Sequence, residues 1–134
     1  MKDQVTSIEQ SKRLLELGVP AEKASMSWVK DPNDNEYSLC VHDECCYEVA
    51  ALEPVPAFTV ADLLGMMPRE LPNPTLGGHM ARLAIDFIPD KVGICYLTGS
   101  YVILGGHQAV GSDIQTALIE EIEWLVFNGY RSNL

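Results

Sequence analysis

The sequence predicts an α+β fold: an antiparallel sheet of about four to six strands, with an N-terminal and a C-terminal helix packed on it. Two observations support this prediction. Apolar residues recur at helical spacing near both ends of the chain, whereas short segments between them alternate apolar and polar residues. With 134 residues, 47% hydrophobic and 21% charged, the chain fits a single domain spanning residues 1–134.

The clearest alternation lies in residues 81–106, which we expect to form three consecutive strands. Pro89-Asp90 and Gly99-Ser100 supply turns between the strands, and the third strand is the short apolar segment from Tyr101 to Leu104. The expected inward residues of the first two strands are Leu83, Ile85, Phe87, Val92, Ile94 and Tyr96. This pattern is typical of an antiparallel meander with a buried face.

The first helix is expected to begin at Thr6, because Thr6 and Glu9 have the spacing of a capping box. Gly18 should end it, and residues 21–24 favour one further helical turn. A hairpin follows, with strands from Met26 to Lys30 and from Glu36 to Val41 joined by a polar turn. Its inward residues should be Trp28, Tyr37 and Leu39, and alternation at residues 47–51 favours another strand.

Pro54 and Pro56 predict a bend, after which Thr59 and Asp62 predict the start of a short helix that ends at Pro68. Residues 69–78 contain two prolines and two glycines, so we expect an irregular loop there.

The final helix should begin at Ser112 and end at Asn128-Gly129. Its apolar stripe is formed by Ile114, Leu118, Ile122 and Leu125. We expect Glu120, Glu121 and Glu123 to lie mainly outside that stripe.

The charge balance excludes one broad class of partner. Nineteen acidic against nine basic residues give a net charge of −10, which repels phosphates and disfavours direct nucleic-acid binding. No apolar run is long enough to span a membrane, and the N-terminal segment has no apolar core of a secretory signal. We therefore expect a cytoplasmic protein.

The candidate metal ligands are Cys40, His42, Cys45 and Cys46, whose thiolates and imidazole suit zinc in type. No second Cys/His pair lies at a familiar distance, so Cys95, His79 or His107 would have to complete the site through the fold. The alternative is that these are small thiols without a ligand role. We therefore predict no cofactor and no catalytic residue, and keep a metal- or thiol-dependent enzyme as an alternative.

Two histidines follow glycine pairs, at Gly77-Gly78-His79 and Gly105-Gly106-His107. Such segments could present an imidazole from a loop, but glycine before a polar residue is typical of a turn. No recognised signature of nucleophilic catalysis or phosphate binding is present.

Two segments, 9–22 and 56–68, resemble a family of small uncharacterised proteins from gut anaerobes and their prophages. Members pair an "EQ…LLELGL" helix with a "PAWSLxxLLxLLP" segment and a C-terminal amphipathic helix ending in Gly-Tyr. Gly129 and Tyr130 fit that ending, whereas Phe58 stands where many members carry Trp. The family has no established activity, so the resemblance implies no catalytic residues, only an accessory protein of a mobile element.

These observations favour a small cytoplasmic interaction or accessory protein without catalysis, which acts through a protein partner. A homodimer is left open. A further alternative is an acidic mimic of nucleic acid that inhibits a DNA-binding protein.

Overall fold

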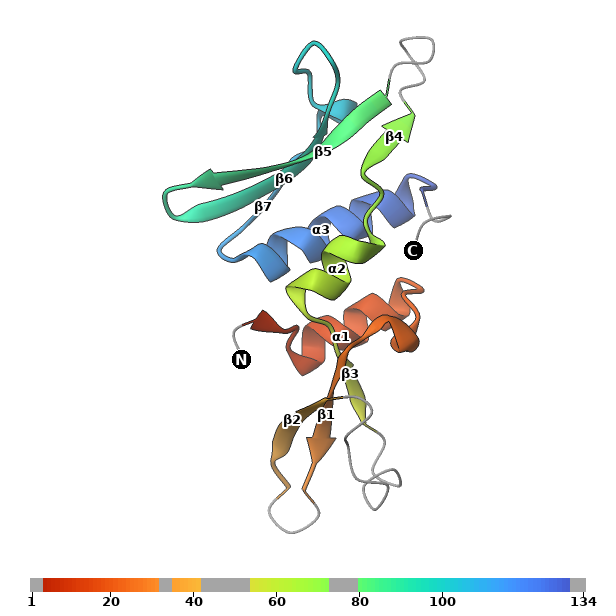
Figure 1. Ribbon diagram of the computed structural model, residues 1–134, viewed down its shortest axis with the longest axis vertical. Coiled ribbons are helices and arrows are strands. Elements are labelled where there is room, and N and C mark those ends of the chain that lie inside the picture. Colours follow the sequence, from red (N-terminus) through yellow and green to blue (C-terminus); the bar gives the residue numbers. More distant parts are fainter. Residues whose placement is uncertain (1–3, 32–34, 42–53, 73–79, 131–134) are drawn as a thin grey trace. The chain divides into compact units, whose positions relative to one another are not determined.

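The computed structural model describes residues 4–31, 35–41, 54–72 and 80–130. Within them it contains three α-helices and two antiparallel sheets, so the predicted α+β class is confirmed (Figure 1). The strands are divided between a three-stranded and a four-stranded sheet. The chain forms two compact units, built on residues 1–64 and 65–133, which are described separately below.

The first unit combines helix α1 (Ile8–Glu16) with a sheet of order β2-β1-β3. Its strands are β1 (Met26–Lys30), β2 (Tyr37–Val41) and β3 (Val55–Ala57), and a 3-10 turn, η2 (Ala21–Lys23), precedes β1. Helix α1 packs on β3. The hairpin and the extra helical turn are confirmed, whereas the predicted strand at residues 47–51 lies outside the described residues.

Helix α1 begins one residue later than predicted. Ser7, not Thr6, is the N-cap, and it forms a capping box with Gln10. Thr6 is fully buried, where its hydroxyl lies 2.7 Å from Ser11 Oγ and accepts a hydrogen bond from the Phe58 amide at 3.0 Å. The Thr6 side chain therefore joins segments far apart in the chain, a role that local sequence does not reveal.

Two further expectations for the first unit are wrong. Tyr37 is 36% exposed, because it pairs with Lys30 at the turn end of the hairpin, away from the core around Trp28. Pro56 does not mark a bend: it lies within β3, opposite Ser27 of β1. Proline is tolerated there because β3 is an edge strand of its sheet.

Helix α2 (Val60–Met66) begins as predicted. Thr59 Oγ1 accepts a hydrogen bond from the Asp62 amide at 3.0 Å, and Asp62 accepts one from the Thr59 amide at 2.9 Å. Asp62 also accepts hydrogen bonds from the amide and the hydroxyl of Ser25, at 2.8 and 2.5 Å. One carboxylate thus holds both the start of α2 and the residue before β1.

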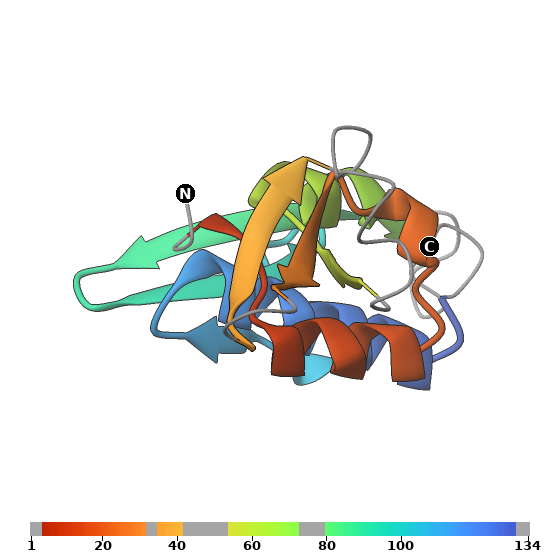
Figure 2. The same cartoon turned by 90° about the horizontal axis from the view of Figure 1, so that it is seen from below.

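The second unit is a four-stranded antiparallel sheet of order β4-β5-β6-β7, with helix α3 (Ile114–Phe127) packed on β6 and β7. The strands are β4 (Glu70–Pro72), β5 (Met80–Ile88), β6 (Lys91–Leu97) and β7 (Ala109–Gly111). Figure 2 shows the tip of the β5–β6 hairpin reaching past the start of α3. Phe87, near that tip, is 73% exposed.

The predicted meander is confirmed for its first two strands and wrong for its third. Residues after Leu97 turn back tightly, so that Ile103 forms only an isolated bridge to Leu97. Leu104–Gly106 then forms a 3-10 turn, η4, and the third strand of the meander is β7. The expected loop at 69–78 is wrong at β4, where Leu71 is buried and pairs with Ala81; residues 73–79 lie outside the described part.

The core of the second unit lies between α3 and its sheet. Ile94, Tyr96 and Ala109 from the strands are buried with Leu118, Ile122 and Leu125 from the helix. The Tyr96 hydroxyl donates a hydrogen bond to the Pro68 carbonyl at 2.7 Å, which satisfies its polar atom within the core. In the described part of the chain, no helix has the length and apolar character to cross a membrane.

Candidate functional site

The turn from β7 into α3 fixes where the helix side chains point. Asp113, not Ser112, is the N-cap, and its carboxylate accepts a hydrogen bond from the Thr116 amide at 2.8 Å. Gly111 allows this tight turn, because a Cβ there would lie 2.7 Å from the Ala117 amide nitrogen. The helix is therefore anchored at its first turn.

Glu121 occupies a core position on α3. It lies three residues after Leu118 and four before Leu125, on the same side of the helix. Glu121 is 0% exposed, so the expectation that it lies outside the apolar stripe is wrong. Glu120 is exposed and Glu123 half-buried. Burial raises the pKa of Glu121 to about 8, against a smaller opposing effect of the backbone of Ala109.

His107 is placed beside this carboxyl group by the two glycines of η4. Gly105 and Gly106 both have positive φ angles, 67° and 66°, which glycine adopts readily. At Gly105 the backbone also approaches the indole of Trp124, because an added Cβ would lie 2.9 Å from Trp124 Cζ2. The chain then leaves η4 at His107, next to α3.

His107 and Glu121 form a pair at the edge of the core. His107 Nε2 lies 3.2 Å from Glu121 Oε2, and the side chains are 33% and 1% exposed. Within the described residues, neither carboxylate oxygen nor Nε2 has a hydrogen bond of standard geometry. One proton between the two atoms would give each a partner, as buried polar groups require.

Two aromatic rings, those of Trp124 and Tyr130, extend from this pair. The imidazole of His107 stacks on the indole of Trp124, with ring centroids 5.2 Å apart and planes 2° from parallel. Tyr130 contacts the same indole with a centroid distance of 5.8 Å and a tilt of 30°. The packing of Trp124 on both neighbours holds the imidazole in a defined orientation.

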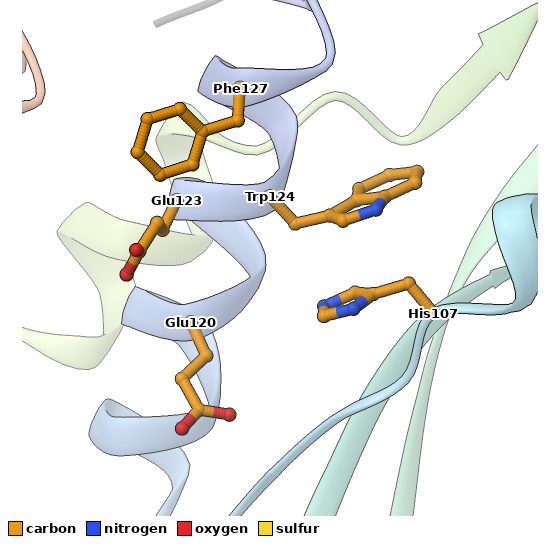
Figure 3. A pocket seen from close by; sticks show the side chains of 5 residues that line it. All are labelled: His107, Glu120, Glu123, Trp124 and Phe127. Carbon is orange, nitrogen blue, oxygen red and sulfur yellow. The ribbon is translucent and has the colours of Figure 1, made fainter.

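A pocket of about 350 Å³ opens on this face of α3, and we call it the α3 pocket (Figure 3). Glu120, Glu123, Trp124 and Phe127 line it from the helix, and His107 lines it from the segment after η4. Residues spaced three and four apart share one side of a helix, which explains the helical part of this set. Phe127 is 72% exposed, so its ring offers apolar surface to a ligand.

Two other buried ionisable groups lie on strand β6 and are influenced by Glu121. Burial raises the pKa of Tyr96, and the charge of Glu121 raises it further. Burial likewise raises the pKa of the Cys95 thiol, with smaller contributions from Glu121 and Asp86. Both groups stay protonated near neutral pH, so Cys95 lacks the thiolate that a nucleophile needs.

Other pockets offer less chemistry. One in the first unit is lined by side chains without an ionisable group: Gln4, Val5, Thr59, Val60, Ala61 and Leu64. Another lies between β5 and the turn after β6, and its polar side chains are those of Arg82, Thr98 and Tyr101. Neither contains a buried ionisable pair.

The predicted metal ligands are only partly placed. Cys40 lies in β2 opposite Ser27 and is a half-buried free thiol, whereas His42, Cys45 and Cys46 lie outside the described residues. Among described side chains, no three or more His, Cys, Asp or Glu residues gather as metal ligands do. The metal hypothesis stays a prediction.

The sequence did not predict the pairing of His107 with Glu121. The available signals were Gly105-Gly106 before a histidine and a glutamate within an apolar helix stripe. The first signal is also typical of a simple turn, and the second falls outside the stripe that the apolar residues of the helix define.

No family model, no curated protein and no solved structure matches the chain. The fold and the α3 pocket therefore carry the functional argument.

Proposed function

We propose that this protein is a non-catalytic interaction protein that binds a basic segment of a partner protein in the α3 pocket. The observation that carries the proposal is the combination of aromatic and acidic side chains in one pocket. Trp124, Phe127 and His107 supply ring surfaces, and Glu120 and Glu123 supply carboxylates.

Cationic side chains fit such a lining for two reasons. Aromatic faces attract a cation through the ring quadrupole, by about 0.5–2 kcal/mol depending on desolvation. Carboxylates add Coulomb attraction and hydrogen-bond acceptors. An anionic ligand would meet repulsion from both the pocket and the chain's net charge of −10.

The arrangement of the side chains around the α3 pocket also favours binding over catalysis. The His107–Glu121 pair could act as a general base, but Cys95, the nearby thiol, is buried and protonated. The exposed ring of Phe127 and the carboxylate of Glu120 are instead suited to hold a partner at the surface.

The test compares binding of a short basic peptide with that of the same peptide carrying Glu in place of each Lys and Arg. We expect only the basic peptide to bind, measured by fluorescence anisotropy. Glu120→Gln with Glu123→Gln should weaken binding about three- to tenfold, the sum of two partly exposed charge interactions.

The matched control is Glu70→Gln with Asp90→Asn, which makes the same change in net charge at exposed residues outside the pocket. This control should bind within about twofold of the wild type, because distant exposed charges are screened. Equal weakening by both double variants would show that net charge, not the α3 pocket, causes binding, and would contradict the proposal.

A further inference from the structure

We infer that the α3 pocket binds an arginine side chain, whose guanidinium group lies against the aromatic lining next to His107 and Trp124. Its binding releases a proton from the His107–Glu121 pair. This inference rests on the proposed function and names its ligand. It follows from the shape, the charge and the proton content of the pocket.

The shape of the pocket favours a flat cation. The rings of His107 and Trp124 lie within 2° of parallel, and Figure 3 shows their planes one above the other. Those two rings stack on each other, and the exposed ring of Phe127 supplies an open aromatic face. Guanidinium is planar and weakly hydrated, so it stacks on an aromatic face, whereas the compact ammonium of lysine keeps its water. The 72% exposed ring of Phe127 adds surface for the methylene stem.

The charge of the pocket selects a cation over a neutral planar group. The lining contains the carboxylates of Glu120 and Glu123, and none of its described residues is a lysine or an arginine. The fork of guanidinium donors matches a carboxylate in geometry. A neutral isostere with the same flat shape lacks this attraction.

The proton on the pair opposes the bound cation. His107 lines the pocket, and its Nε2 lies 3.2 Å from the buried Glu121 carboxyl. The proton keeps the Glu121 carboxyl uncharged, and its loss adds a negative charge beside the pocket that attracts guanidinium, so binding favours the pair with fewer protons. By linkage, affinity for the cation must then rise as pH rises through the titration of the pair.

Other ionisable groups lie around the pair. On β6, burial raises the pKa values of Tyr96 and Cys95, so both stay protonated near neutral pH, and Asp86 lies near Cys95. Strand β7 (Ala109–Gly111) carries no ionisable side chain. Glu120 and Glu123 on α3 line the pocket.

The experiment uses three peptides, acetylated and amidated, identical except for a central arginine, lysine or citrulline. Citrulline keeps the planar shape of arginine and removes its charge. Calorimetric titration of the full chain at about pH 6 and pH 8 should give an affinity for arginine roughly three- to tenfold above lysine, with citrulline weaker still. The arginine affinity should rise about three- to tenfold between the two pH values.

Each outcome has a separate meaning. Equal binding of arginine and lysine peptides would overturn the inference and leave the basic-segment proposal standing. Equal binding of citrulline would overturn both, and so would the absence of any binding. An arginine affinity independent of pH would overturn the proton linkage.

Variants assign the effect to the pocket. Phe127→Ala should weaken arginine binding about two- to fivefold. Its matched control is Phe87→Ala, which removes an equally exposed ring at the hairpin tip, outside the pocket, and should leave affinity unchanged. Glu121→Gln keeps a planar polar group in place of the carboxyl and removes the titrating proton, so it should remove the pH dependence. A Glu121→Gln protein that retained the pH dependence would overturn the proton linkage.

Discussion

At the scale of single residues, the buried carboxyl of Glu121 is the most consequential feature. Its position on α3 suits a leucine, and its two oxygens lack hydrogen bonds of standard geometry within the described residues. Burial makes the charged form of this carboxyl costly, so the fold favours the protonated form. The stability of the protein should therefore depend on pH through this residue.

Glu121→Gln should stabilise the protein at alkaline pH. The pKa of Glu121 is raised from 4.5 to about 8, so the folded state keeps a proton that the unfolded state loses. Stability therefore falls as pH rises from about 4.5 to about 8 in the wild type and not in the variant. Urea unfolding at both ends of that window should show a relative gain of about 1–3 kcal/mol at the upper end.

The control for this experiment is Glu120→Gln, at an exposed neighbour on the same helix. It should shift stability equally at both pH values. A pH-independent effect of Glu121→Gln would show that the carboxyl is ionised throughout the range, in contradiction with its burial.

Gly105→Ala should destabilise the protein more than Gly106→Ala. Both residues have positive φ angles, which cost a side chain about 1–2 kcal/mol. Only at Gly105 would the new Cβ also meet Trp124, at 2.9 Å, whereas nothing lies within 4 Å at Gly106. We expect losses of about 2–4 and about 1–2 kcal/mol respectively, measured by thermal unfolding.

Gly99→Ala provides the baseline, because its φ is ordinary and no atom lies within 4 Å of the added carbon. Equal losses at positions 105 and 106 would mean that the indole moves aside without cost. In that case Gly105 would not determine the placement of His107.

At the scale of secondary structure elements, helices were predictable because their signals are local. The limits of α1, α2 and α3 follow from caps, apolar spacing and glycines within each segment, and the errors amount to one residue at Ser7 and Asp113. Strands depend on distant partners. Pro56 and Leu71 lie in short strands only because β1 and β5 provide their neighbours, which no local pattern encodes.

Asp62 is the element-scale contact with the clearest test. Burial tends to raise its pKa, but hydrogen bonds from Ser25 and Thr59 outweigh burial and hold the pKa below the usual 3.8. The resulting stability is present above pH 4 and is lost as pH falls through the folded pKa. Asp62→Asn should therefore reduce the unfolding free energy by about 1–2 kcal/mol at neutral pH and by less near pH 2.

This prediction is checked by urea unfolding monitored with circular dichroism at the two pH values. Asp113→Asn serves as a comparison, because it changes an equivalent capping side chain that lacks the link to Ser25. Losses of the same size in both variants would show that helix capping alone explains Asp62, without the contact to the segment before β1.

At the scale of the whole molecule, the site depends on topology more than on any segment. His107 reaches Glu121 because β7 turns the chain so that α3 packs back on β6 and β7. From the sequence, the net charge of −10 disfavours nucleic-acid binding. The sequence does not indicate the pair, because thirteen residues lie between His107 and Glu121 and neither lies in a recognised motif.

The same net charge predicts fast association with a basic partner. Long-range attraction raises the association rate and is screened by salt, with a screening length of about 10 Å at 0.1 M. In stopped-flow measurements, the association rate of the arginine peptide should fall about tenfold between roughly 0.02 and 0.5 M NaCl.

The citrulline peptide is the control for this measurement, since its uncharged central residue reduces the attraction. Its association rate should depend less on salt. If salt changed only the dissociation rate of the arginine peptide and left its association rate constant, the prediction would be contradicted. Electrostatic attraction would then act only within the bound complex.

The proline in β3 has a consequence for solubility. A sheet edge with free backbone donors can pair with the edge of another molecule, and repeated pairing leads to aggregates. Pro56 has no N–H, so an incoming strand finds one donor fewer at the centre of the three-residue β3. Replacement of Pro56 by valine would restore that donor, and thus turn this edge into a template on which further chains could assemble.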